Sequence, residues 1–185
     1  MEKFISKEFL NKSQIITEER IAFSLEKAFS NVFNKKEKKE YGIFLSHKHT
    51  DTELVYQFKK MLDSLNIDVY IDWLDDDMPI TTDQETALRL KERIKDSKKF
   101  ILLATDEAIN SKWCNWELGF GDAHKYFENI AILPITNTDG GNWTGNEYLK
   151  TYPAITINKY SNDQSIELYV EFLGKKKRFA DWLKK

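Results

Sequence analysis

The chain has 185 residues, 41% of them hydrophobic and 14% aromatic, so it is long enough to fold as one globular domain with an extension. Its 28 basic and 30 acidic side chains give a formal charge of −2, which argues against a general attraction to nucleic acid or to an anionic membrane. The single cysteine, Cys114, excludes an intrachain disulfide and fits a reducing compartment. Because the sequence also lacks a signal-peptide pattern and the roughly 18 consecutive apolar residues of a membrane span, we expect a cytoplasmic protein.

Residues 1–39 are predicted to form a helical extension. Two groups of apolar residues recur there at helical spacing: Phe4, Ile5, Phe9 and Leu10, and then Ile21, Leu25, Ala28, Phe29, Val32 and Phe33. A charged run from Lys35 to Glu40 follows, so we place the boundary there and assign residues 40–185 to one domain. The apolar faces exceed what a free extension should expose, which predicts that these helices pack on the domain or on a second copy of the chain.

After residue 40, predicted strands and helices alternate. The strands are expected at residues 41–46, 67–72, 100–105, 129–135 and 154–157. The helices are expected at residues 52–66, 83–97, 111–127 and 164–183. This order predicts a flavodoxin-like α/β fold, a five-stranded parallel sheet in the order 2-1-3-4-5 with helices on both faces.

In such a sheet the ligand site lies at the carboxyl ends of the strands, where the winding reverses between the first and third strands. The residues that follow those two strands are Ser46, His47, Lys48, Thr105 and Asp106. An acidic loop, residues 73–82, follows the second strand and can fold over the same crevice. We expect this loop to be mobile and to become ordered when a ligand binds or copies assemble.

The helix that begins after Ser111 carries the most informative stretch of the chain. Aromatic residues at helical spacing predict its buried face, which comprises Trp113, Trp116, Phe120, Ala123 and Phe127. Glu117 lies four residues after Trp113, so the two side chains are neighbours on the helix. Glu117 is either a surface carboxylate that covers the indole or a functional carboxylate at the mouth of the crevice. The topology favours the second interpretation.

Other chemistries have weaker support. The first strand is followed by no glycine-rich loop, so the Rossmann and Walker fingerprints are absent. His47 and His49 would suggest a metal, with Asp51, Asp72 or His124 as partners. Because the spacing fixes no further ligand, the pattern favours exposed loop histidines and we expect no metal site.

Three more features have competing interpretations. The acidic run at residues 75–77 would suit Mg²⁺ or a receiver-type phosphorylation pocket, but a solvated loop is favoured. Cys114 is interpreted as a packing residue because no histidine lies at a spacing that would activate it. Trp143 and Tyr148 are either packing residues or a lid over the crevice.

Three segments in order resemble the Toll/interleukin-1 receptor (TIR) domain family, especially its bacterial stand-alone members. Residues 41–47 (YGIFLSH) resemble the family's opening box, and residues 72–79 occupy the place of its mobile loop. Residues 111–118 (SKWCNWEL) resemble its third-helix motif, in which Trp-x-x-x-Glu supplies the catalytic glutamate. The resemblance spans residues 40–184 and implies the flavodoxin-like fold. The loop departs from the family pattern, since it is acidic and lacks the glycine often found there.

The resemblance implies an enzyme that cleaves the nicotinamide–ribose bond of NAD⁺. NAD⁺ would be the substrate, and no separate cofactor is expected. Glu117 would be the catalytic carboxylate, with Trp113 as its packing neighbour. The residues expected to bind substrate are Phe44, Ser46, His47, Asp72, Trp73 and Trp113.

By family analogy the product is linear, cyclised or transferred ADP-ribose, and it would act as a signal that an effector protein reads in antiphage defence. Self-association through the surfaces of this domain is also implied. The main alternative is a non-catalytic adaptor that assembles through the loop after the second strand. A response-regulator receiver shares the topology, but Asp106 comes too late to match its phosphoacceptor.

Overall fold

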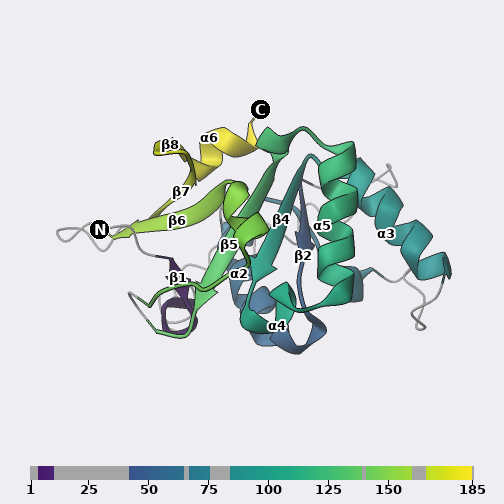
Figure 1. The fold of residues 1–185 in the computed structure, drawn as a ribbon, viewed down its shortest axis with the longest axis horizontal. Coiled ribbons are helices and arrows are strands. Elements are labelled where there is room, and N and C mark those ends of the chain that lie inside the picture. Colours follow the sequence, from purple (N-terminus) through teal and green to yellow (C-terminus); the bar gives the residue numbers. More distant parts are fainter. Residues whose placement is uncertain are drawn as a thin grey trace, which may run out of the picture.

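The computed structural model describes residues 4–10, 42–64, 67–75, 84–138, 141–159 and 166–184. A central sheet has the strand order β3-β2-β4-β5-β6-β7-β8, and β1 pairs with β5 (Figure 1). Its strands are β1 (Ile5–Ser6), β2 (Ile43–Ser46), β3 (Val69–Tyr70), β4 (Lys99–Ala104), β5 (Ile130–Thr136), β6 (Ala154–Lys159), β7 (Ile166–Phe172) and β8 (Lys175–Arg178). The α-helices are α2 (Thr52–Ser64), α3 (Gln84–Asp96), α4 (Asp106–Ile109), α5 (Lys112–His124) and α6 (Phe179–Leu183). Short 3₁₀ turns are η1 (His49–Asp51), η2 (Asp72–Leu74), η3 (Phe127–Asn129) and η4 (Glu147–Thr151).

The parallel part of the sheet confirms the predicted order. Strands β3, β2, β4, β5 and β6 lie side by side and run parallel, which is the order 2-1-3-4-5. All six residues of β4 are buried, as expected for a parallel strand covered on both faces. Its side chains alternate, so Phe100 and Leu102 pack on one side of the sheet while Ile101 and Leu103 pack on the other.

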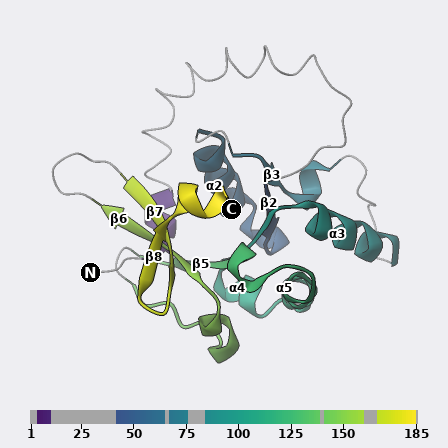
Figure 2. The same ribbon diagram turned by 90° about the horizontal axis from the view of Figure 1, so that it is seen from above.

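Helices cover both faces of this sheet, as predicted. The core that contains α2 also contains residues of β1 and α6, whereas the core on the other face is formed by α3, α4 and α5. Figure 2 shows α2 and α5 on opposite sides of the strands. In the described part of the chain, no helix is long and apolar enough to cross a membrane.

The C-terminal segment differs from the prediction. Residues 164–183 were expected to form one helix, but strands β7 and β8 form an antiparallel hairpin beside β6 and only α6 is helical. The sequence of β7, IELYVEF, alternates apolar and polar residues with the period of a strand. At the turn, Leu173 has φ 49° and Gly174 has φ 73°. The sheet therefore has more strands than the five expected, although its fold class is unchanged.

The N-terminal segment also departs from the helical prediction. Ile5–Ser6 forms β1, which pairs with Ile135 and Thr136 of β5, and only residues 7–10 of the described segment are helical. Ile5, Phe9 and Leu10 are buried in the core shared with α2. This part of the extension therefore packs on the domain. Residues 11–41 lie outside the described segments, so their second apolar pattern and the boundary at residue 39 remain predictions.

Candidate functional site

Helix α5 brings Glu117 against the end of strand β2. Ser46 is the last residue of β2, and its Oγ donates a hydrogen bond to Glu117 Oε2 at 2.5 Å. Ser46 is fully buried, and Glu117 is only 7% exposed. A carboxyl group is thus held inside the protein at the carboxyl end of a central parallel strand, where the topology predicts a ligand site.

Local contacts fix this position of α5. Ser111 caps the helix, because its Oγ accepts a hydrogen bond from the Cys114 backbone N–H at 3.4 Å. One turn further, Cys114 Sγ donates to the backbone oxygen of His47 at 3.2 Å, which ties the helix start to the residue after β2. Near the other end, Gly121 faces Phe100, and an added Cβ would lie 3.1 Å from that ring. The lack of a side chain at Gly121 therefore allows α5 to approach the sheet closely.

The predicted buried face of α5 is wrong for Trp113, Ala123 and Phe127, which are exposed, whereas Trp116 and Phe120 are partly buried and pack against the core. The buried residues of the helix are Cys114, Glu117, Leu118 and Gly121, which also recur at helical spacing. Trp113 is 38% exposed and meets Trp116 edge to face, while Trp116 stacks on Phe120. The Nζ atom of Lys91 on α3 lies 5.7 Å from the Trp116 ring centroid and 5.6 Å from that of Phe120. The large aromatic side chains thus form a partly exposed row beside α3, and the smaller residues pack against the sheet.

Burial favours the protonated form of the Glu117 side chain. It raises the pKa of the carboxyl group to about 8, the hydrogen bond from Ser46 opposes that rise, and the negative charge of Asp72 adds to it. Ligand-free Glu117 is therefore mostly protonated at neutral pH. A positive charge placed beside it would favour the carboxylate form.

His47, Asp72 and Trp73 lie together next to this pair. His47 Nδ1 donates to Leu45 O at 2.9 Å, and its Nε2 lies 3.3 Å from Asp72 Oδ1. Asp72 begins η2, where its Oδ1 also accepts from the Trp73 backbone N–H at 2.9 Å. The Trp73 ring stands edge-on to His47, with the centroids 4.4 Å apart. Burial lowers the pKa of His47, and the charge of Asp72 opposes that effect.

Phe44 belongs to the core beneath the site. It is 2% exposed and stacks between Tyr70 and Phe100, with centroid distances of 5.3 and 5.5 Å. Of the predicted substrate-binding residues, Ser46, His47, Asp72 and Trp73 therefore gather near Glu117, Phe44 supports the strand from inside, and Trp113 lies on the exposed aromatic row.

The start of the acidic loop is not simply solvated. Asp75 Oδ2 accepts hydrogen bonds from Arg93 Nε at 2.8 Å and from the Tyr70 hydroxyl at 3.0 Å, and its side chain is 7% exposed. The interpretation of a solvated loop is therefore wrong for Asp75, which anchors the loop to α3. Residues 76–83 lie outside the described segments, so the mobility of the loop remains a prediction.

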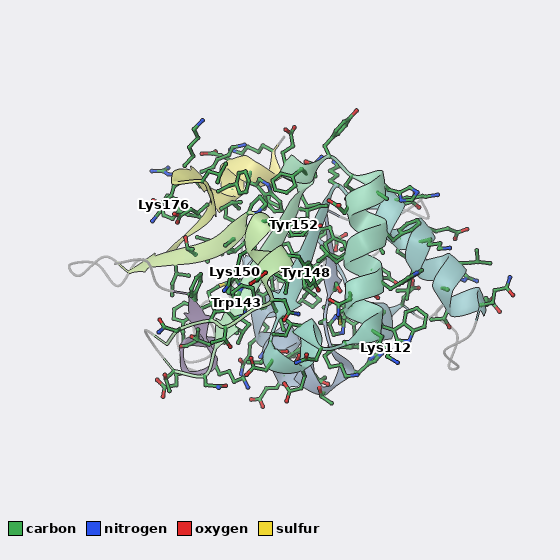
Figure 3. The ribbon with its side chains drawn as sticks, viewed as in Figure 1. Lys112, Trp143, Tyr148, Lys150, Tyr152 and Lys176 are labelled. Atoms are coloured by element: carbon green, nitrogen blue, oxygen red, sulfur yellow. The ribbon has the colours of Figure 1, made fainter. Side chains whose placement is uncertain are left out.

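Several neighbours of the site have packing roles that the sequence left open or did not reveal. Trp143 Nε1 donates to the backbone oxygen of Ala104 at 2.9 Å, and the Tyr148 hydroxyl bonds to Asn115 Oδ1. Figure 3 labels the Trp143 and Tyr148 side chains. Trp143 packs against the core, which supports the packing interpretation for this residue, whereas Tyr148 is 44% exposed and its role stays open. Thr105, which caps α4, donates to Asp51 Oδ2 at 2.6 Å. Its position just after a strand is the only sequence signal for that contact.

Cys114 is a packing residue at the base of the site. It is 1% exposed, and burial raises the pKa of its thiol to about 11. Because the thiolate is the reactive form, this environment disfavours a nucleophilic role, in agreement with the sequence interpretation.

The family-model match and the similar protein sequences indicate one family. Residues 43–169 match the family model described as TIR domain. The chain is 30% identical over 192 residues to the probable 3' cyclic ADP-D-ribose synthase ThsB' of Bacillus cereus (strain MSX-D12), with coverage of 99% of this chain and 98% of that protein. It is 29% identical over 185 residues to the probable 2' cyclic ADP-D-ribose synthase TcpO of Methanobrevibacter olleyae, covering 95% of this chain and 50% of that protein. Among solved structures, it is similar to the TIR domain of the Toll-related receptor TRR-2 from Hydra magnipapillata, at 18% identity and a TM-score of 0.42, covering 50% of this chain and 68% of that one.

Proposed function

The chain belongs to the TIR domain family, and on that basis we propose that it is an enzyme that consumes NAD⁺ by cleaving the bond between nicotinamide and ribose. The observation that carries the proposal is the hydrogen bond between Ser46 and the buried Glu117 at the carboxyl end of β2. A second support is the similarity, over nearly the whole of both chains, to a protein named as a cyclic ADP-D-ribose synthase.

Cleavage of the nicotinamide–ribose bond requires one carboxylate in the right position. When the bond between the ribose C1 atom and the nicotinamide nitrogen breaks, its electron pair leaves with neutral nicotinamide and positive charge develops on the sugar. A carboxylate fixed beside the ribose stabilises that charge and can bind the ribose hydroxyls. Because nicotinamide is already a good leaving group, no second catalytic acid is needed, unlike in ordinary glycosidases. Glu117 takes this role in the proposal.

The positive charge of NAD⁺ also explains how a mostly protonated Glu117 becomes active. The substrate brings a pyridinium cation, and a nearby cation lowers the pKa of a carboxyl group. Ser46 helps, since its hydroxyl donates to Glu117 Oε2. Substrate binding therefore generates the ionised form in the complex that uses it.

The fate of the sugar decides the product. Attack by water on the C1 atom gives linear ADP-ribose, whereas attack by a nucleophilic group of the same nucleotide gives a cyclic ADP-ribose. Attack by a group on another molecule gives a conjugate. When the attacking group is water or a hydroxyl, it loses one proton, which passes to Glu117 or to solvent. We favour the cyclic product because two similar proteins are named as cyclic ADP-D-ribose synthases.

Access to Glu117 requires a change in the ligand-free arrangement. With 7% of its surface exposed, its carboxyl group cannot meet the ribose until the residues around it move. We propose that the loop after β3 opens and closes the site and that self-association of the chain promotes the open form. The product would then act as a nucleotide signal for an effector in antiphage defence, an idea that rests on family analogy.

The test is incubation of the full chain with NAD⁺ and separation of the products by mass. We expect nicotinamide and one nucleotide product in equal amounts, and cyclic and linear ADP-ribose are distinguished by the mass of one water. The measurement is made over a range of protein concentrations to promote assembly. If NAD⁺ stays intact at every concentration, the proposal fails and the non-catalytic adaptor becomes the better account.

A further inference from the structure

Two histidines and one carboxylate meet at the edge of the site. His47 follows β2 and His49 begins η1 in the same connection, while Asp72 begins η2 after β3, so two connections contribute the three side chains. The nearest atoms are His47 Nε2 to Asp72 Oδ1 at 3.3 Å and His49 Nε2 to Asp72 Oδ2 at 3.8 Å. One potential ligand atom from each of the three residues lies within 4.8 Å of the other two.

The buried environment of His47 fixes the orientation and the tautomer of its ring. Its side chain is 3% exposed, and its Nδ1 must carry a hydrogen because it lies 2.9 Å from the carbonyl oxygen of Leu45. In the neutral ring, Nε2 then presents a lone pair. That atom is buried and has no hydrogen-bond partner among the described residues, although the Asp72 carboxylate faces it. Two electron-pair donors thus face each other, an arrangement that a cation between them would stabilise.

The contact between His47 and Leu45 is also typical of metal-binding histidines. A ligating imidazole almost always donates its second ring N–H to a carbonyl or carboxylate, which fixes the tautomer and the ring orientation. Here the donor is Nδ1 and the acceptor is a backbone oxygen on β2, an element that is buried along its whole length. The direction of the Nε2 lone pair is therefore set by the sheet itself.

The distances suit a small metal ion. Ligand bonds of about 2.0–2.1 Å in tetrahedral geometry place neighbouring ligand atoms roughly 3.4 Å apart. The pair formed by His47 and Asp72 already has this spacing at 3.3 Å. The three ligand atoms lie within 4.8 Å of one another, so the widest pair must close by roughly 1 Å to reach this spacing. The His49 side chain is 75% exposed and has the freedom to make that movement.

We propose that His47 Nε2, His49 Nε2 and the Asp72 carboxylate form a binding site for a divalent transition-metal ion of the Zn²⁺ type. Two imidazoles and one carboxylate select such ions over Mg²⁺ and Ca²⁺, which prefer oxygen ligands. Three protein ligands leave a fourth position open to water or to a ligand. The sequence alone favoured exposed loop histidines because the spacing of His47 and His49 did not identify Asp72 as the partner.

The bound metal would inhibit NAD⁺ turnover, a consequence that rests on the proposed function. Ser46, which bonds to Glu117, immediately precedes His47. A metal that joins His47 to Asp72 would hold η2 and Trp73 against the end of β2. Because substrate entry requires movement around the buried Glu117, bound metal is expected to slow NAD⁺ turnover and to raise the melting temperature.

The experiment uses the full chain treated with a chelator and then titrated with Zn²⁺ by calorimetry and with Co²⁺ by visible absorption. We expect one ion per chain and a Co²⁺ spectrum with the intense bands of low-coordinate nitrogen and oxygen ligation. His49→Ala should weaken Zn²⁺ binding at least tenfold. His124→Ala is the matched control, because His124 is the third histidine of the sequence and lies at the end of α5.

The Zn²⁺ and Co²⁺ binding measurements test the metal site independently of whether the protein cleaves NAD⁺. Equal Zn²⁺ affinity in the parent and in His49→Ala, a Co²⁺ spectrum that stays that of the hydrated ion, or a thiolate band from Cys114 would each overturn the metal site. If the protein cleaves NAD⁺, Zn²⁺ should inhibit the parent and His124→Ala but not His49→Ala, and His49→Ala should keep the parent rate in chelator. Zn²⁺ binding without inhibition of NAD⁺ cleavage would retain the metal site but refute its inhibitory role.

Discussion

Burial of Glu117 beside Ser46 concentrates the chemistry of the site in one pair of side chains. The sequence placed Ser46 after the first parallel strand and Glu117 in the first turns of a helix near that strand, so their proximity followed from topology. The burial of the carboxyl group did not follow, because aromatic residues pointed to a different face of α5. Burial depends on which side of the helix fits against Phe100, and one helix sequence does not contain that information.

The raised pKa of Glu117 predicts a pH-dependent stability. Between its ordinary value of 4.5 and about 8, the unfolded chain loses this proton while the folded chain keeps it. The folded state therefore binds more protons in this range, and the contribution of Glu117 to stability falls as pH rises. In Glu117→Gln the contribution is absent. The free energy of unfolding of the variant minus that of the parent should increase with pH across this window, at most by about 1.4 kcal/mol per pH unit.

Urea unfolding of both proteins at several pH values measures this difference. Glu128→Gln is a control, because Glu128 is exposed on η3. A difference between parent and Glu117→Gln that stays constant from pH 5 to pH 8 would contradict a buried, protonated Glu117.

Ser46→Ala should shift the pH dependence of turnover. Ser46 donates a hydrogen bond that lowers the pKa of Glu117, so its removal should raise that pKa further. If the ionised carboxyl is the active form, kcat/KM of the parent rises with pH toward about 8, and the rise in Ser46→Ala should move to higher pH. Ser97→Ala removes another buried hydroxyl at the end of α3 and should leave the profile in place. Identical pH profiles for Ser46→Ala and the parent would show that this hydroxyl does not tune Glu117.

At the scale of elements, the site depends on how closely α5 approaches the sheet. The sequence predicted the start of this helix correctly at Ser111, because a capping serine is a local signal. It did not predict the hairpin of β7 and β8, since residues 164–183 also contain a helix-like set of apolar residues. The strand period in IELYVEF was the stronger signal, and pairing with β6 decides the outcome.

Two glycines in α5 provide a matched test of this approach. A Cβ at Gly121 would lie 3.1 Å from the Phe100 ring, whereas a Cβ at Gly119 would meet no atom within 4 Å. Gly119→Ala should stabilise the protein by about 0.5–1 kcal/mol through helix propensity. Gly121→Ala should lose that gain and cost about 1–3 kcal/mol by overpacking. Because the helix must shift outward, Gly121→Ala should also lower NAD⁺ turnover while Gly119→Ala does not.

Thermal unfolding and turnover of the two alanine variants give the answer together. Equal stability and equal activity in Gly119→Ala and Gly121→Ala would mean that the spacing between α5 and β4 does not position Glu117.

At the scale of the whole molecule, the fold class and the order of the parallel strands could be predicted from the sequence, but the strands at the edges of the sheet could not. Five parallel strands in the order 2-1-3-4-5 agree with the prediction from alternating apolar strands and helices. The additional strands β1, β7 and β8 lie where pairing with distant segments decides the structure. Ile5–Ser6, for example, is a strand only because Ile135 and Thr136 of β5 pair with it.

The N-terminal segment should contribute to the stability of the domain. Ile5 is fully buried against β5 and its neighbours in the core, so Ile5→Ala should lower the free energy of unfolding by about 2–4 kcal/mol. Leu173→Ala, at a site that is 84% exposed, should change it by less than about 0.5 kcal/mol. A chain that starts at Glu40 should likewise be less stable than the full chain. A truncated chain as stable and as active as the parent would refute this role.

In the proposed mechanism, Glu117 supplies the charge that stabilises the developing cation on ribose. Glu117→Gln keeps the shape of the side chain and removes its charge, and Glu128→Gln makes the same change at the exposed η3 site. The most direct measurement is the rate of nicotinamide release from NAD⁺ by the parent and both variants, with binding of NAD⁺ measured in parallel. We predict a fall in turnover of about 100-fold or more for Glu117→Gln, a smaller change in binding, and parent-like turnover for Glu128→Gln. Turnover by Glu117→Gln at the parent rate, under conditions in which the parent is active, would remove Glu117 from the mechanism.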